Sequence, residues 1–177
     1  MKPDEKGSKK YERAGSLIWL PRKMITLHGS DNMSEFVLHE LSRKQCFDFQ
    51  KAAYLVDNPD FNCVRGVAGV CQLEAAPWDN IWQKPEEFSM HMQQSAFNKK
   101  VRSLVRASAK KVNIEADREL ALDVGRELGM GNVEYCSWIG KNDNHGILIF
   151  ERNSHGDDID NEDLMNGASL LSFCPIY

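Results

Sequence analysis

One histidine and three cysteines in the first half of the chain are residue types that hold zinc or carry thiol chemistry: His39, Cys46, Cys63 and Cys71. Zinc takes such ligands at about 2.0–2.3 Å, so all of them would have to converge on one point. If His39 and Cys46 share a helix, their seven-residue spacing puts them about 10.5 Å apart along its axis. Cys63 and Cys71 can meet only if the intervening VRGVAGV segment folds back. The four are candidate metal ligands, but the favoured alternative is that the thiols are buried as small apolar side chains.

A cysteine nucleophile needs a neighbouring base, and the nearest pair in the sequence is Cys136 and His145. The runs VEYCSWI and ILIFER are rich in strand formers and flank the polar segment GKNDNHG, so a β-hairpin is predicted. In that hairpin Cys136 lies several residues down a strand and His145 lies in the loop, so no contact is expected. Asp143 and His145 are a second candidate, a polar site at the loop tip.

A basic segment, QSAFNKKVRSLVRASAKKV at 94–112, contains six Lys and Arg residues and no acid in a chain of net charge −4. Its apolar residues recur every three or four positions, which predicts an amphipathic helix. Lys99, Arg102, Arg106 and Lys110 form one stripe on that helix, at intervals of about 6 Å where the spacing is four. Such a row is a candidate anion-binding surface.

The alternative for this stripe is a solvated face that offsets nearby acidity, which is the usual role of a charge run. Residues 113–177 carry 4 basic and 13 acidic groups. Glu119, Asp123 and Glu127, spaced by four, predict an acidic stripe on the next helix. This alternative is favoured, and the sequence leaves open whether the two stripes pair within one chain or between two.

Other binding motifs are incomplete. The acidic run at 157–163 lacks the glycine and ligand spacing of a calcium-binding EF-hand loop. The segment at 119–139 has the cadence of a helix-turn-helix, but its second half carries no Lys or Arg and prefers a strand, so DNA reading is not favoured. There is no CxxC pair, Walker loop or GxSxG elbow, and the sequence names no cofactor.

The elements that must position these residues are predicted as follows. Residues 1–15 form a disordered tail, and 16–20 and 24–28 form two short strands or one bent one. A central helix with two apolar faces runs from about 34 to 56, and 63–73 is a strand or a buried helix. A helix begins at Pro85, a second follows the basic one and ends at Gly129, and the hairpin comes next. An acidic loop and a last strand or tail close the chain.

Size and composition define the class of molecule. At 177 residues, with 42% hydrophobic and 27% charged residues, the chain suits one globular domain. No apolar run approaches the roughly 20 residues of a membrane-spanning helix. Five scattered cysteines favour reduced thiols, and the lack of a signal sequence sets the expected location as the cytoplasm.

We therefore predict a single α+β domain over 16–177, preceded by the tail, with three or four helices on a small, mostly antiparallel sheet that includes a C-terminal hairpin. Two function classes stay open. The first is an intracellular binding or regulatory domain for a small anionic ligand or a protein partner, with homo-oligomer formation as a further option. The second is a metal- or thiol-dependent enzyme that uses His39, Cys46, Cys63 and Cys71, or His145.

Overall fold

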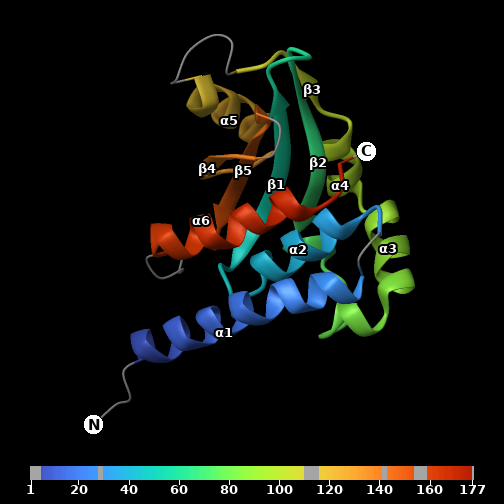
Figure 1. Cartoon of the computed structure of the whole chain (residues 1–177), viewed down its shortest axis with the longest axis vertical. Coiled ribbons are helices and arrows are strands. Elements are labelled where there is room, and N and C mark those ends of the chain that lie inside the picture. Colours follow the sequence, from blue (N-terminus) through green and yellow to red (C-terminus); the bar gives the residue numbers. More distant parts are fainter. Residues whose placement is uncertain (1–4, 28–29, 110–115, 141–142, 154–158, 177) are drawn as a thin grey trace.

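The computed structural model describes residues 5–27, 30–109, 116–140, 143–153 and 159–176, without the side chains of 5–10, 12 and 13. This part of the chain forms an α+β domain with six α-helices (Figure 1). The class matches the prediction, and the helices outnumber the expected three or four. They are α1 (Glu5–Thr26), α2 (Met33–Ser42), α3 (Pro85–Gln94), α4 (Ala96–Arg102), α5 (Ala116–Glu127) and α6 (Asn161–Ser169).

The sheet has five antiparallel strands in the order β3-β2-β1-β5-β4. The strands are β1 (Phe49–Asn58), β2 (Cys63–Cys71), β3 (Val105–Arg106), β4 (Glu134–Ile139) and β5 (His145–Arg152). β1 is central and pairs with β2 on one side and with β5 on the other. β4 and β5 form the predicted C-terminal hairpin, with Cys136 opposite Leu148 and Ile139 opposite His145.

Apolar side chains cover both faces of the sheet. On one face, Ala52, Tyr54 and Val56 of β1 pack with residues of α1, α2, α3 and α6. On the other face, Ala53 and Leu55 pack with residues of α4 and α5. The sheet is therefore the middle layer of three, and α6 and α2 cross its front in Figure 1.

The predicted helix over 34–56 is wrong in its second half. α2 ends at Ser42, Asp48 adopts a positive φ of 52°, and β1 starts at Phe49. Because β1 is buried on both faces, its apolar residues do not alternate, and the run can be read with either period. The first half does form a central helix, since all ten residues of α2 are buried.

The predicted strands at 16–28 are also wrong, because α1 runs through Thr26 with Pro21 inside it. Leu17, Leu20 and Met24 recur at helical spacing and pack on the core, with Leu20 buried. The predicted boundary between tail and domain at 15–16 stays a prediction, and α1 crosses it. The acidic loop expected at 153–167 is wrong from Asn161 onward, because α6 spans Asn161–Ser169, and a 3₁₀ turn at Leu170–Phe173 follows where a last strand or tail was expected.

Candidate functional site

The candidate metal ligands lie on different elements. His39 is on α2, Cys46 follows that helix, and Cys63 and Cys71 are the first and last residues of β2. Eight residue steps of a strand place these two cysteines about 26 Å apart. Within the described ranges, no group of three or more His, Cys, Asp or Glu residues could hold a metal ion. The structure therefore does not bring the four candidates together.

His39 has an unusual environment for a titratable group. It is buried between α2 and α3, where its ring meets Phe88 edge-on at 5.2 Å between centroids. Its Nδ1 has no hydrogen-bond partner among the described residues. Burial lowers the pKa of His39 from 6.5 to about 4; Glu40 opposes this shift, and Arg43 and His91 add to it. The side chain is thus neutral at pH 7.

This environment predicts a loss of stability in mild acid. Because the pKa of His39 is lower in the folded than in the unfolded chain, the unfolded chain binds more protons between pH 6.5 and about 4. The contribution of His39 to the free energy of unfolding should fall by about 2 kcal/mol between pH 7 and pH 5. Urea unfolding at both pH values should show this loss in the wild type and a smaller one in His39→Gln. Equal losses in the two proteins would contradict the assignment.

The hairpin keeps Cys136 and His145 apart, as expected from the sequence. Cys136 pairs with Leu148, three positions beyond His145 and so about 10 Å along the strand. Burial also raises the pKa of the Cys136 thiol to about 12, so the thiol is protonated at neutral pH and a poor nucleophile. Asp143 is exposed in the loop with a positive φ of 57°, but the expected position of His145 in the loop is wrong, because His145 pairs with Ile139 as the first residue of β5.

The basic segment does not form one helix. α4 ends at Arg102, and Val105 and Arg106 form β3 beside β2. Lys110 lies outside the described residues. The predicted stripe of four cations on one helical face is therefore wrong, because Val105 and Arg106 join the sheet by pairing with β2.

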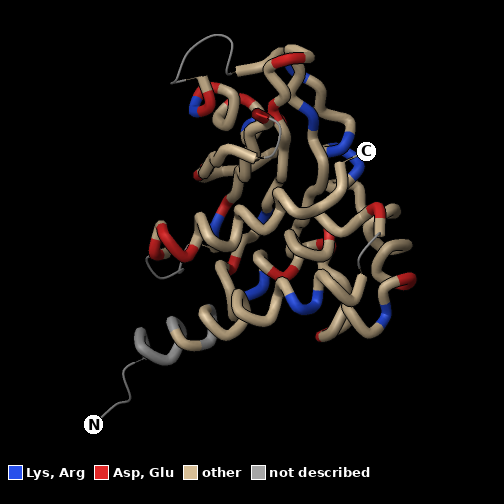
Figure 2. The backbone as a smooth tube through the Cα atoms, viewed as in Figure 1, with Lys and Arg blue, Asp and Glu red and all other residues tan. Residues whose placement is uncertain are grey.

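Two of the candidate cations are paired within the chain. Arg102 donates to the Glu35 carboxylate at 3.0 Å, and Arg106 pairs with Glu127. Lys100 donates to the Glu127 carbonyl oxygen at the end of α5. Figure 2 shows basic residues gathered around α4 and β3, with acidic residues on α5 and at the start of α6. The favoured alternative for this segment, charge that offsets local acidity, agrees with these contacts.

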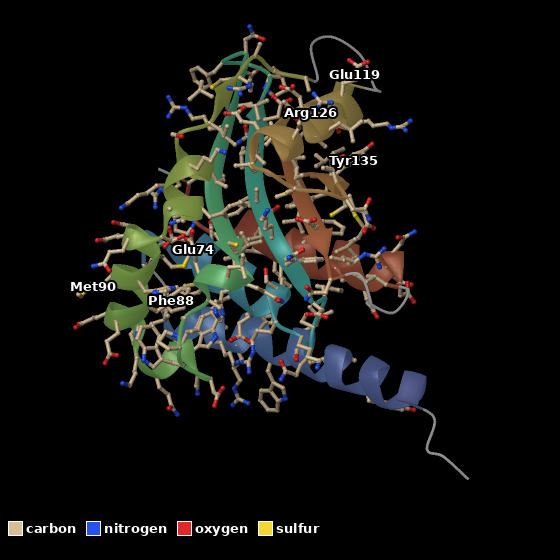
Figure 3. All side chains as sticks on the ribbon, turned by 180° about the vertical axis from the view of Figure 1, so that it is seen from behind. Glu74, Phe88, Met90, Glu119, Arg126 and Tyr135 are labelled. Carbon is tan, nitrogen blue, oxygen red and sulfur yellow. The ribbon has the colours of Figure 1, made fainter. Side chains whose placement is uncertain are left out.

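The outer side of α1 is apolar and lacks a partner in the described chain. Ile18 and Ile25 are exposed at 72% and 73%, and Tyr11 and Trp19 are exposed as well. A methyl group on Gly15 would meet nothing within 4 Å. Figures 1 and 3, seen from opposite sides, both show the amino-terminal part of α1 projecting beyond the rest of the domain.

A strip along α1, here called the α1 seam, contains the exposed residues Tyr11, Ile18, Arg22 and Ile25 and the half-buried Gly15. At 100° per residue, Tyr11, Ile18 and Ile25 fall within about 40° of one another, with Arg22 about 20° to one side. The Arg22 guanidinium lies 5.4 Å from the Trp19 ring centroid. The sequence analysis missed this seam, although the seven-residue spacing of Tyr11, Ile18 and Ile25 was the available signal.

Comparison with known proteins does not assign this chain to a family. No protein family and no curated protein matches the sequence. A solved structure titled "SdiA in complex with octanoyl-rac-glycerol" is 13% identical, with a TM-score of 0.40, over 87% of this chain and 63% of that chain. The chain thus spans less than two thirds of that structure, and the likeness is distant. None of the described helices has the length and apolar character needed to cross a bilayer.

Proposed function

We propose that this chain is a protein-binding domain that holds an acidic, amphipathic helix of a partner along the α1 seam. The observation that carries the proposal is the line of exposed Tyr11, Ile18 and Ile25 on a helix whose opposite side is packed on the core. Apolar residues at this spacing are what one helix offers to another. Gly15, about 60° around the helix from Ile18, leaves room beside this line for a close approach of the partner.

A charge on the exposed side of α1 favours a partner helix over a lipid surface. Arg22 lies between Ile18 and Ile25 along the axis, and its guanidinium is 5.4 Å from the ring centroid of the exposed Trp19. A cation in this position suits a facing carboxylate better than hydrocarbon.

The charge of the segment favours an acidic partner. Residues 1–23 carry seven basic and three acidic groups, and Arg22 is exposed. Complementary charges beside an apolar line set partner choice in helix pairs. A partner helix with apolar residues every three or four positions and glutamates beside them fits both features.

Two synthetic helical peptides test the proposal. Each has roughly four heptads with leucine at a and d, and they differ only in glutamate or lysine at e and g. Titration calorimetry should show binding of the glutamate peptide and at least about tenfold weaker binding of the lysine peptide. Arg22→Glu should reduce or reverse this preference, while Arg65→Glu, an exposed change on β2, should leave it unchanged.

Other outcomes of these experiments would contradict the binding of an acidic helix at the α1 seam. Equal binding of both peptides, or a charge preference that Arg22→Glu leaves intact, would refute it. Binding to vesicles of anionic phospholipid with no binding of either peptide would point to a membrane surface instead.

The two earlier alternatives have less support. A small anionic ligand on Lys99, Arg102, Arg106 and Lys110 would compete with Glu35 and Glu127 for the two arginines. A metal- or thiol-dependent enzyme would need residues that lie on separate elements, with Cys136 protonated. Neither alternative explains the exposed side of α1.

A further inference from the structure

The β4 strand is an edge of the sheet with an open main chain. It pairs with β5 on one side and is last in the strand order. In an antiparallel edge strand, alternate residues direct their N–H and C=O groups away from the neighbour. Among the described residues, no hydrogen bond outside the β4–β5 pairing reaches the main chain of Glu134–Ile139. Within the described ranges, these groups therefore have no partner that would compete with another strand.

At the opposite edge of the sheet, other parts of the chain cover the main chain of β2. β3 pairs with only two residues of β2, and α4 covers the rest. The Asn98 side chain accepts a hydrogen bond from the Gly69 N–H at 2.9 Å, and the Leu104 carbonyl accepts one from the Gly66 N–H at 3.1 Å. Within the part of the chain that the structure describes, the edge of β2 is thus satisfied internally and the edge of β4 is left open.

β4 also lacks the features that protect an edge strand. Its sequence, EYCSWI, contains no lysine, arginine or proline, and its register with β5 is regular. Its one charged residue, Glu134, is held by Arg152, whose Nε lies 2.6 Å from the Glu134 Oε1. Nothing in the strand therefore repels a second strand.

The exposed side chains of β4 suit a copy of the same strand. Tyr135 and Ile139 are 38% and 77% exposed, and their spacing of four places them on one face of β4 with Ser137 between them. Figure 3 shows Tyr135 on the same side of the molecule as Glu119 and Arg126 of α5. A two-fold axis at Ser137 would set Tyr135 of each copy opposite Ile139 of the other. An aromatic residue opposite a β-branched one is a favourable cross-strand pair.

We infer that β4 pairs antiparallel with β4 of a second copy about Ser137, which joins the two sheets into one. The sequence of β4 favours a second copy of the same strand as its partner. One symmetric register pairs both exposed apolar residues, Tyr135 and Ile139, and places no two like charges opposite each other. The Ser137 hydroxyl donates to Asp117 of α5 at 2.9 Å, so the axis position carries a small side chain already turned toward its own chain. A strand pair of this length buries less than the roughly 1,200 Å² of a standard interface, so the dimer should be weak.

Sedimentation equilibrium over a range of concentrations tests the interface. The wild type should show a monomer–dimer equilibrium, and Ile139→Lys should raise its dissociation constant at least about tenfold. Ile18→Lys is the matched control, since Ile18 is similarly exposed but lies on the α1 seam. It should leave the equilibrium unchanged. A monomeric wild type at every concentration, or a dimer lost in Ile18→Lys and kept in Ile139→Lys, would overturn the inference.

Cross-linking tests the register independently. Tyr135→Cys and Ile139→Cys should form an intermolecular disulfide when the two variants are mixed under mild oxidation. Neither variant alone should exceed the wild-type background, which reports the native cysteines. Equal cross-linking of one variant with itself would refute the two-fold at Ser137. Because this surface is separate from the α1 seam, peptide binding and dimer formation can fail independently.

Discussion

Replacing Asn98 by leucine is expected to lower the free energy of unfolding by about 3–5 kcal/mol. Asn98 lies on α4 and is 1% exposed. Both the nitrogen and the oxygen of its side-chain amide form hydrogen bonds. Its Nδ2 donates to the Glu35 Oε1 at 2.7 Å and to the Met92 carbonyl at 3.0 Å. Its Oδ1 accepts from the Gly69 N–H at 2.9 Å.

Leucine keeps the volume and removes all three hydrogen bonds. The Gly69 N–H and the Met92 carbonyl would lose the amide that binds them, and each orphaned buried group costs about 1–3 kcal/mol. Glu35, 2% exposed, would keep Arg102 at 3.0 Å and Asn32 at 3.2 Å but lose its shortest hydrogen bond. The large effect is expected because the substitution removes hydrogen bonds to the main chain of β2 and to a buried carboxylate.

Urea unfolding measures this effect, with an unchanged dependence on denaturant as evidence that the folded state is intact. Asn132→Leu is the matched control, because Asn132 is exposed. The control should change stability by less than about 0.5 kcal/mol. A loss below about 1 kcal/mol in Asn98→Leu would mean that the amide does not hold α4 to β2.

Local signals in the sequence predicted the elements that are fixed locally. Pro85 at a first helical position gives α3, which spans Pro85–Gln94, and the two strand-forming runs give the hairpin of β4 and β5. The α+β class followed from such segments. By contrast, β1 depends on pairing with strands on both sides, and no local period distinguishes it from a buried helix. The end of α4 is likewise set by the pairing of Val105 and Arg106 with β2.

The charged contacts were also predicted only in part from the sequence. The acidic stripe with Glu127 was expected to offset the basic segment, and Arg106 does pair with Glu127 in the same chain. The partner of Arg102, however, is Glu35, which is 67 positions away and was expected on an apolar helix. The α1 seam was missed for a different reason. The segment at 16–28 was interpreted as strands, and in a strand residues seven positions apart do not lie on the same face.

Two glycine-to-alanine substitutions should change stability in opposite directions. Gly66→Ala is expected to lower the free energy of unfolding by about 3 kcal/mol, because a methyl group there would lie 1.8 Å from the Val101 carbonyl oxygen. That oxygen is main chain, so no side-chain rotation can relieve the clash. α4 would have to move off β2 and strain the hydrogen bond between the Gly66 N–H and the Leu104 carbonyl.

Gly15→Ala is the matched substitution with the opposite sign. Gly15 lies inside α1, and a methyl group there meets nothing within 4 Å. Alanine loses less backbone entropy than glycine on entering a helix, so stability should rise by up to about 1 kcal/mol. Urea unfolding of both variants measures the contrast. A neutral Gly66→Ala would contradict the close approach of α4 to β2, and a destabilised Gly15→Ala would contradict the open surface at the seam. The sign of each change therefore depends on what lies beside the glycine, since the substitution itself is the same.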